Sequence, residues 1–198
     1  MADYRYIALT AGILGLGCTD TRARDPLSPD LAVTKTPVVL VGAGDIAGCP
    51  STYQDEATAD LLDGIAGTVF TLGDNAYTSA TTAEYQNCYG PSWGRHLART
   101  RPALGNHEYH TTAAAGYFGY FGDKAGPANL GYYSYNLGEW HVVVLNSERN
   151  LSAQATWLKA DLAANPTRCT LAYWHKPYFT SGTNPPALTL KTPFHPTV

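Results

Sequence analysis

The sequence is poor in charged residues and has no long stretch of one sign. Only 15% of its 198 residues are Asp, Glu, Lys or Arg, and the formal net charge is -3. A surface that binds nucleic acid needs clustered Lys and Arg, usually with aromatic side chains between them, and no such stretch is present. We therefore expect no nucleic-acid partner.

The apolar run near the N-terminus is too short to span a bilayer. It covers residues 7–16, whereas a transmembrane helix needs about 20 apolar residues. With Arg5 before it, the run is typical of an export signal. The Gly-Leu-Gly-Cys segment at residues 15–18 resembles a bacterial lipoprotein cleavage box, which makes Cys18 a candidate lipidation site. We expect an exported protein that is secreted, periplasmic or lipid-anchored at the cell surface; an uncleaved N-terminal helix is the alternative.

The chain has enough apolar material for one packed domain, with 44% hydrophobic and 12% aromatic residues. Residues 38–41 and 68–72 are short β-branched runs, and residues 52–65 between them have the apolar spacing of a helix. Its expected apolar face consists of Ala57, Leu61, Leu62 and Ile65. This pattern predicts two parallel strands joined by a right-handed helical crossover.

The remaining elements follow the same reasoning. Residues 101–104 predict a third short strand, residues 132–145 a β-hairpin around a Gly-Glu turn, and residues 169–174 a last strand. The glycine-rich and ring-rich segment 116–122 is expected to be a packed loop. A helix is expected at residues 152–164. The predicted units are an export segment (1–18), a linker (19–36), a domain (37–182) and an irregular tail (183–198).

Cysteine is scarce, with four in the chain. Of the three after Cys18, two could form a bridge in an oxidising compartment, which would leave one thiol free. Cys49 and Cys88 fall in loops at the same expected sheet edge, whereas Cys169 begins a strand and should lie at the other end. We expect a Cys49–Cys88 disulfide, with three buried free thiols as the alternative.

Polar side chains follow four of the predicted strands. Asp45, Asp74, Asn106 and His175 each come directly after one, and the carboxyl ends of parallel strands meet at one edge of a sheet. Carboxylate, amide and imidazole groups are good ligands for a pair of cations, because the metal charge suppresses the repulsion between the carboxylates. The sequence therefore predicts a binuclear metal site.

These residues belong to motifs that recur in one known family. The motifs are Gly-Asp at 44–45, Gly-Asp-Asn-Ala-Tyr at 73–77, Gly-Asn-His-Glu at 105–108, and the later His175. Together they resemble the calcineurin-like metallophosphoesterases, and specifically their purple acid phosphatase branch. The general family has Asp-Xaa-His in its first motif, and that histidine is absent here. Tyr77 matches the tyrosine ligand that purple acid phosphatases use instead.

The resemblance implies an α/β fold of the metallophosphoesterase type, an αββα sandwich with mixed sheets whose second sheet is incomplete here. It implies hydrolysis of phosphoric esters by two metal ions, Fe³⁺ with Fe²⁺, Zn²⁺ or Mn²⁺, on a phosphorylated small molecule or protein. The implied metal ligands are Asp45, Asp74, Tyr77, Asn106 and His175. Asp74 would bridge the two ions and His107 would contact the substrate. Glu108 would support the ligands from behind, and His110 is a weaker candidate for substrate contact.

One family motif has no counterpart in the sequence. The family closes its site with Gly-His-Xaa-His, which gives a ligand to each metal, and only His195 follows His175. Further strands are also missing, so the chain is expected to be truncated or to carry an altered reading frame after Gly182. The alternative is a non-catalytic phosphoesterase domain that binds metal weakly or not at all. An incomplete sheet would also favour self-association.

A different class of enzyme fits one short segment. Gly42, Gly44 and Ala47 after a strand satisfy a loose dinucleotide-binding fingerprint, which would indicate an oxidoreductase. However, Pro50 lies where the helix of that fingerprint should already be running. The fingerprint also leaves Tyr77, Asn106 and His175 without a role, so we prefer the phosphoesterase interpretation.

Overall fold

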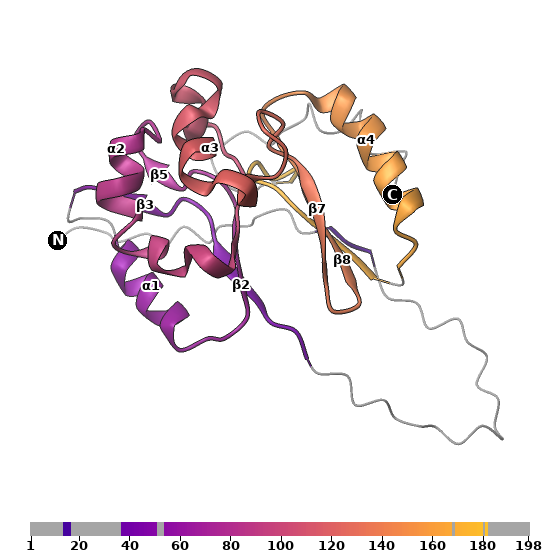
Figure 1. Cartoon of the computed structure of the whole chain (residues 1–198), viewed down its shortest axis with the longest axis horizontal. Coiled ribbons are helices and arrows are strands. Elements are labelled where there is room, and N and C mark those ends of the chain that lie inside the picture. Colours follow the sequence, from indigo (N-terminus) through magenta and orange to yellow (C-terminus); the bar gives the residue numbers. More distant parts are fainter. Residues whose placement is uncertain (1–13, 17–36, 51–53, 168, 180, 182–198) are drawn as a thin grey trace.

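The computed structural model describes residues 14–16, 37–50, 54–167, 169–179 and 181 (Figure 1). The predictions of a lipid anchor at Cys18, a linker at 19–36 and a tail at 183–198 lie outside this part of the chain. Within it, none of the helices combines the length and the apolar character needed to cross a bilayer.

A small parallel sheet with the strand order β2-β4-β6 forms the first half of the fold. The helix α1 (Asp55–Asp63) connects β2 (Leu40–Ala43) to β4 (Thr68–Thr71), and the two strands are parallel, which confirms the predicted crossover. The third strand, β6 (Thr100–Arg101), pairs with β4 and is shorter than predicted, because it ends before Pro102, which has no N–H to donate to a ladder.

The apolar face of α1 is only partly as predicted. Leu62 is buried as predicted, and Ala59 is buried as well. However, Ala57 is exposed, and Leu61 is 67% and Ile65 38% exposed. The helix begins only after Gln54 and ends at Asp63, so Ile65 lies beyond it. The buried face is therefore narrow, as expected for a short helix that covers one side of a small sheet.

A second sheet has the strand order β1-β9-β8-β7. β7 (Tyr133–Leu137) and β8 (Trp140–Val144) form the predicted antiparallel hairpin, and β9 (Cys169–Tyr173) pairs parallel to β8. β1 (Leu14–Leu16) pairs antiparallel with β9, so part of the segment predicted as an export signal forms an edge of this sheet.

The chain between the two sheets is mostly helical. Its elements are α2 (Thr82–Glu84), η1 (Tyr85–Tyr89), η2 (Trp93–Arg99), η3 (His107–His110), η4 (Thr112–Ala114), α3 (Ala115–Phe121) and η5 (Gly122–Ala125). The prediction of a loop at residues 116–122 is therefore wrong. Tyr117 and Phe121 lie four residues apart and are 0% and 3% exposed, so burial of both rings on one helical face outweighs the poor helix propensity of the glycines.

Side chains from the two sheets meet in one apolar cluster. Val142 and Val144 point to the same face of β8 and pack with Leu72 and Tyr173. The rings of Phe70 and Tyr173 have centroids 5.3 Å apart, which joins β4 to β9. Alternate residues of a strand face opposite sides, so this cluster uses one face of the second sheet only.

The outer faces of both sheets are covered by helices (Figure 1). Residues of α1, η1, η2 and α3 pack in one cluster with Val69 of β4. On the other side, α4 (Leu151–Ala164) places Leu158 against Val143 and Trp174. The fold is therefore mixed α/β, with these two open sheets between helices. A third, two-stranded parallel sheet consists of β3 (Ala47–Gly48) and β5 (Ala76–Tyr77).

The disulfide pair expected from the sequence is present. Cys49 and Cys88 are bonded with their Cα atoms 4.9 Å apart, and they join the loop after β3 (Ala47–Gly48) to η1. Cys169 is also disulfide-bonded, and the described part of the chain contains no free cysteine. The expected leftover thiol is therefore wrong.

Replacement of Cys49 and Cys88 by alanine is expected to lower the free energy of unfolding by about 3 to 4 kcal/mol. The bridge spans 39 residues, and a crosslink restricts the unfolded chain more strongly as the closed loop grows. Urea unfolding of both proteins in non-reducing buffer measures the difference. Cys49→Ala alone should lose nearly the same amount; a double variant as stable as the native chain would show that this bridge does not form in solution.

Candidate metal centre

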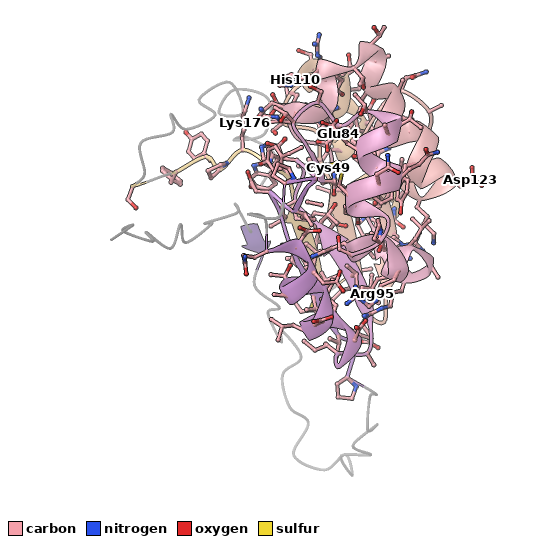
Figure 2. All side chains as sticks on the ribbon, turned by 90° about the vertical axis from the view of Figure 1, so that its left-hand side faces the viewer. Cys49, Glu84, Arg95, His110, Asp123 and Lys176 are labelled. Carbon is pink, nitrogen blue, oxygen red and sulfur yellow. A yellow bond between two sulfur atoms is a disulfide. The ribbon has the colours of Figure 1, made fainter. Side chains whose placement is uncertain are left out.

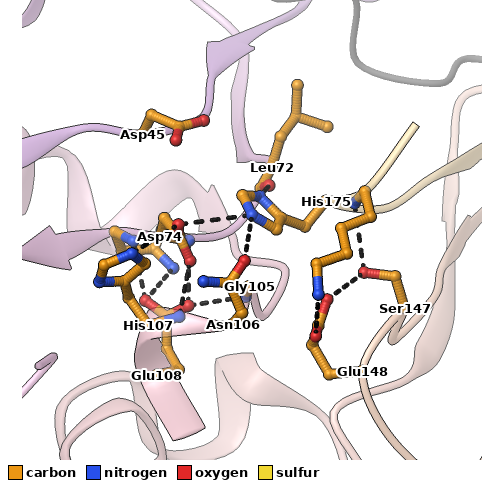
Figure 3. A network of polar contacts seen from close by, with 12 residues as sticks. Asp45, Leu72, Asp74, Gly105, Asn106, His107, Glu108, Ser147, Glu148 and His175 are labelled. Atoms are coloured by element: carbon orange, nitrogen blue, oxygen red, sulfur yellow. Dashed lines mark hydrogen bonds and ion pairs between the residues drawn. The ribbon is translucent and has the colours of Figure 1, made fainter. Parts of the chain in front are cut away.

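The four predicted strand-end ligands lie close together (Figure 3). Asp45 follows β2, Asp74 follows β4, Asn106 follows β6 and His175 follows β9. Backbone hydrogen bonds join the first two loops, since the Asp45 N–H donates to the Gly73 carbonyl at 3.1 Å. The structure therefore brings all four residues together, from both sheets.

The glycines of the motifs allow two of these loops to touch. Gly73 has φ +84, and a Cβ there would approach the Gly105 nitrogen to 2.6 Å. A Cβ on Gly105 would collide with the Asp74 carboxylate. Asp74 itself has φ +50, a left-handed conformation that aspartate adopts more readily than most residues. The Gly-Asp and Gly-Asn pairs are thus needed for the close contact.

The Asp74 carboxylate is at the centre of the site. It is 3% exposed, and its Oδ1 accepts a hydrogen bond from the His107 backbone N–H at 2.9 Å. Its Oδ2 lies 3.3 Å from the Tyr77 hydroxyl, 3.4 Å from His175 Nε2 and 3.8 Å from His107 Nε2. His175 Nε2 also lies 3.2 Å from the Asn106 Oδ1. One carboxylate is therefore shared by all the neighbouring donors.

Tyr77 joins the two aspartates. It belongs to β5 (Ala76–Tyr77), which pairs with β3, and its hydroxyl donates to Asp45 Oδ1 at 2.5 Å. Burial raises the pKa of Tyr77 well above its usual value, and the charges of Asp45 and Asp74 raise it further. In the metal-free protein the phenol keeps its proton, and a cation is needed to convert it into a phenolate ligand.

His175 is oriented by the backbone. Its Nδ1 lies 2.7 Å from the Leu72 carbonyl, which can only accept, so Nδ1 carries the hydrogen and Nε2 faces Asp74. This is the arrangement of metal-binding histidines, whose second ring nitrogen donates to a fixed acceptor. Burial lowers the pKa of His175, but the hydrogen bond and charge of Asp74 outweigh it and raise the pKa to about 9. Metal binding must therefore displace a proton from this ring at neutral pH.

The interaction between His175 and Asp74 also changes the pKa of the aspartate, and it does so in the opposite direction. Burial by itself would raise the pKa of Asp74, but the hydrogen bond from His175 and the charge of that ring lower it. Asp74 is thus ionised at neutral pH. An ionised carboxylate at the centre of the site is ready to bind a cation.

Glu108 holds together the loop that carries Asp74 and the loop that carries Gly105. It is 0% exposed, and its Oε2 accepts from the backbone N–H groups of Asp74 at 3.0 Å and Gly105 at 2.6 Å. Its Oε1 accepts from the Asn75 backbone at 2.8 Å, the Asn75 amide at 3.2 Å and the Tyr85 hydroxyl at 3.1 Å. Burial and the nearby charge of Asp74 raise the pKa of Glu108, while the backbone donors oppose that rise.

Two histidines of η3 share one acceptor. The Nδ1 atoms of His107 and His110 lie 2.6 and 3.1 Å from the Thr78 carbonyl, and their ring centroids are 4.7 Å apart. Thr78 is itself held by a hydrogen bond from its N–H to the Glu84 carboxylate. The hydrogen on His107 Nδ1 is therefore fixed, and its Nε2 is the ring atom nearer to Asp74. His110 is exposed beside it.

The other two described histidines lie elsewhere. His96 is buried, with Nε2 3.3 Å from the Ala59 carbonyl, and its neighbour Arg95 lies toward the end of the molecule opposite His110 (Figure 2). His141 is buried with Nε2 2.6 Å from Asp161. Neither ring reaches the strand edge, so neither replaces a histidine of the missing family motif.

The described residues fit two metal ions only in part. If only Asp, Glu, His and Cys are counted, the described chain has no group of three or more arranged to hold a metal ion. Binding of a metal at this edge would therefore also need the phenol of Tyr77 and the amide of Asn106. The shared carboxylate of Asp74 and the fixed ring of His175 suit such a set. The single histidine among these five side chains does not suit a pair of metal ions.

A polar network beside the site was not predicted. Lys176 follows His175, its Nζ lies 2.6 Å from Glu148 Oε2, and its N–H donates to Ser147 Oγ at 3.2 Å (Figure 3). The signal in the sequence was the polar run at residues 146–150 directly after an apolar strand. The change from an apolar strand to a polar run is the same pattern that marked the other strand ends.

No protein-family model matches this chain, and no curated protein is significantly similar to it. The resemblance to metallophosphoesterases therefore depends on the motif residues and on the geometry described above.

Proposed function

We propose that the chain is a binuclear metal-dependent hydrolase of phosphoric esters, an acid-phosphatase-like phosphomonoesterase of the purple acid phosphatase type. The observation that carries this proposal is the position of Asp74 Oδ2, which lies 3.3 Å from the Tyr77 hydroxyl and 3.4 Å from His175 Nε2. A carboxylate shared by a phenol and an imidazole suits an anion that bridges two cations. Helices on the outer faces of the two larger sheets support the expected αββα sandwich, which is part of this proposal.

The five side chains divide into two sets that share Asp74. Asp45 and Tyr77 would hold the first ion, and the oxygen-rich, anionic character of that set favours Fe³⁺. Asn106 and His175 would hold the second ion, for which Fe²⁺, Zn²⁺ or Mn²⁺ is suitable. When bound, the two ions would supply an activated water and stabilise the charge on the phosphoryl oxygens. Glu108 keeps the two loops at a fixed separation.

His107 is the residue placed to act on the substrate. Its Nδ1–H is held by the Thr78 carbonyl, and its Nε2 lies 3.8 Å from Asp74 Oδ2 with the side chain 25% exposed. A ring fixed at Nδ1 and open at Nε2 can, in its doubly protonated form, donate a hydrogen bond to a phosphoryl oxygen or a proton to the leaving alcohol. His110 shares the same acceptor and would extend this donor surface.

The second candidate is a phosphoesterase domain that binds metal without turnover. It is favoured by the absence, among the described residues, of any group of three Asp, Glu, His or Cys side chains suited to a metal. The second set is the weaker one, because Asp74 is shared and Asn106 is neutral. We therefore propose that the first position fills more readily than the second and that hydrolysis of an aryl phosphate is slow.

We also propose export to an oxidising compartment, with self-association as a further proposal. The disulfide between Cys49 and Cys88 and the bonded state of Cys169 support export, because such bonds persist mainly outside the reducing cytosol.

Reconstitution of the purified protein with Fe³⁺ and Zn²⁺ tests the proposal. Bound iron is expected to give a visible charge-transfer band from the Tyr77 phenolate, together with measurable hydrolysis of para-nitrophenyl phosphate. Tyr77→Phe should remove the band, while Tyr120→Phe, at a ring remote from the ligands, should retain it. Protein that holds no metal above trace after reconstitution would refute both candidates. A band that survives Tyr77→Phe would refute the role of that tyrosine.

A further inference from the structure

A pocket of about 310 Å³ lies beside η3 and the segment that precedes α4. Its walls include Tyr109, Thr111 and Thr112 from the η3–η4 segment, Asn129 from a loop, and Arg149 and Asn150 from the segment just before α4. Most of these side chains are polar, and one is cationic. A concave site with a few convergent polar groups and one charge is the usual form of a small-molecule site.

The cation in this pocket has no ion-pair partner among the described residues. The Arg149 guanidinium lies over the Tyr109 ring, 4.8 Å from its centroid. No carboxylate of the described chain is within ion-pair distance of it. Lys176, the other cation near the site, differs because it is bound to Glu148 at 2.6 Å. Of these two described cations, Arg149 is therefore the one that is free to bind an anion.

The wall that carries Arg149 is rigidly built. The Asn146 side chain accepts from the Arg149 N–H at 3.2 Å and donates to the Tyr109 hydroxyl at 2.7 Å, so one residue positions both partners of the stacked pair. Gln154 in turn is bonded to the Asn146 backbone at 2.7 and 2.9 Å. A planar guanidinium fixed by a ring can bind carboxylate or phosphate through two parallel hydrogen bonds.

The pocket and the candidate metal centre share two structural segments. Tyr109 lies two residues after His107 in the same turn of η3, and the Tyr109 N–H donates to the Asn106 carbonyl at 3.1 Å. On the other wall, the segment with Arg149 continues from Ser147, which accepts from Lys176 beside His175. An elongated ligand could therefore contact both places.

We propose that this pocket binds a second anionic group on the substrate, a carboxylate or a phosphate on the leaving-group side, through Arg149. The proposal rests on the function proposed above and deepens it, because it names the substrate class as small phosphoesters with a second acidic end. The hydroxyl of Thr112 and the amides of Asn129 and Asn150 make no side-chain hydrogen bond to other described residues, so they can also bind that group.

Hydrolysis of alkyl phosphates by the metal-reconstituted protein tests the substrate role. Three series with graded spacers end in a hydroxyl, a carboxylate or a phosphate. At a spacer that reaches Arg149, KM is expected to be about tenfold lower for an anionic end than for the hydroxyl end. Arg149→Gln should remove the difference in KM between the anionic ends and the hydroxyl end. Arg101→Gln, which removes another arginine that lies over a tyrosine ring (5.2 Å from Tyr135), is the matched control. Equal KM values in all three series would overturn the proposal.

Anion binding to the metal-free protein tests the pocket separately from the proposed hydrolase function. The ¹⁵N resonance of the Arg149 side chain should shift saturably with methyl phosphate or acetate, and the Arg101 resonance should not. The probe that binds more tightly identifies the preferred anion. A saturable shift with no hydrolysis of any series would refute the proposed function and the substrate role but leave an anion pocket. No shift, or a shift without any KM preference in an active protein, would refute the substrate role of Arg149.

Discussion

Asp74→Asn is expected to abolish binding of both metal ions and to lower any hydrolysis of para-nitrophenyl phosphate on the order of a thousandfold. Asp74 is the one carboxylate in contact with the groups of both ligand sets, through Tyr77 at 3.3 Å and His175 at 3.4 Å. The amide is neutral and nearly the same size, so the loop should keep its shape while the charge is lost. Metal content by mass spectrometry and the rate measure the effect.

Two further variants, Asp45→Asn and Asp123→Asn, test whether the loss of both metal ions is specific to Asp74. Asp45 contacts only the Tyr77 side of the site, so its variant should lose the visible band but retain some binding at the position of His175 and Asn106. Asp123 is exposed on η5, and its variant should behave like the native chain. Full metal content in Asp74→Asn would mean that this carboxylate does not bridge.

Glu108→Gln is expected to lower the free energy of unfolding by about 4 kcal/mol. The carboxylate accepts five hydrogen bonds, from Asp74, Gly105, Tyr85 and twice from Asn75. A glutamine presents an NH₂ group to donors on one side, whichever way the amide is turned, and each buried donor left without an acceptor costs about 1 to 3 kcal/mol. Urea unfolding of the metal-free protein measures the loss.

Glu56→Gln is the matched control for this change. Glu56 is an exposed residue of α1 that pairs with Arg95 at 2.9 Å, and exposed ion pairs contribute about 0 to 1 kcal/mol. Its variant should therefore be nearly as stable as the native chain. Equal stability of Glu108→Gln and Glu56→Gln would show that the Glu108 network is not formed in solution.

The parts of this fold that could be predicted are those in which sequence order fixes position. Parallel strands joined by a helix place their carboxyl ends together, so Asp45 and Asp74 could be assigned to one edge from spacing alone. The hairpin at β7 and β8 followed from a Gly-Glu turn between apolar runs. The Cys49–Cys88 pair followed from the same assignment of loops to an edge.

The parts that could not be predicted depend on contacts between distant residues. The segment of α3 is helical because Tyr117 and Phe121 are buried, and its glycines gave the opposite local signal. His96 is buried through its contact with Ala59 of α1, which spacing does not reveal. Likewise, the acceptors that orient His175 and His107 are backbone carbonyls of Leu72 and Thr78, which have no sequence signature.

The contact between Gly73 and Gly105 limits how this site can change by mutation. Any side chain on either glycine collides with the opposite loop, so most single substitutions at these positions should be lost from a library selected for folding or for metal uptake. Rescue would need a second change that moves the other loop, and that change would shift Asp74 as well. The two loops are therefore separate in sequence but must be selected together. Substitutions are expected to be tolerated mainly at the exposed residues around the site, such as Arg149 and His110.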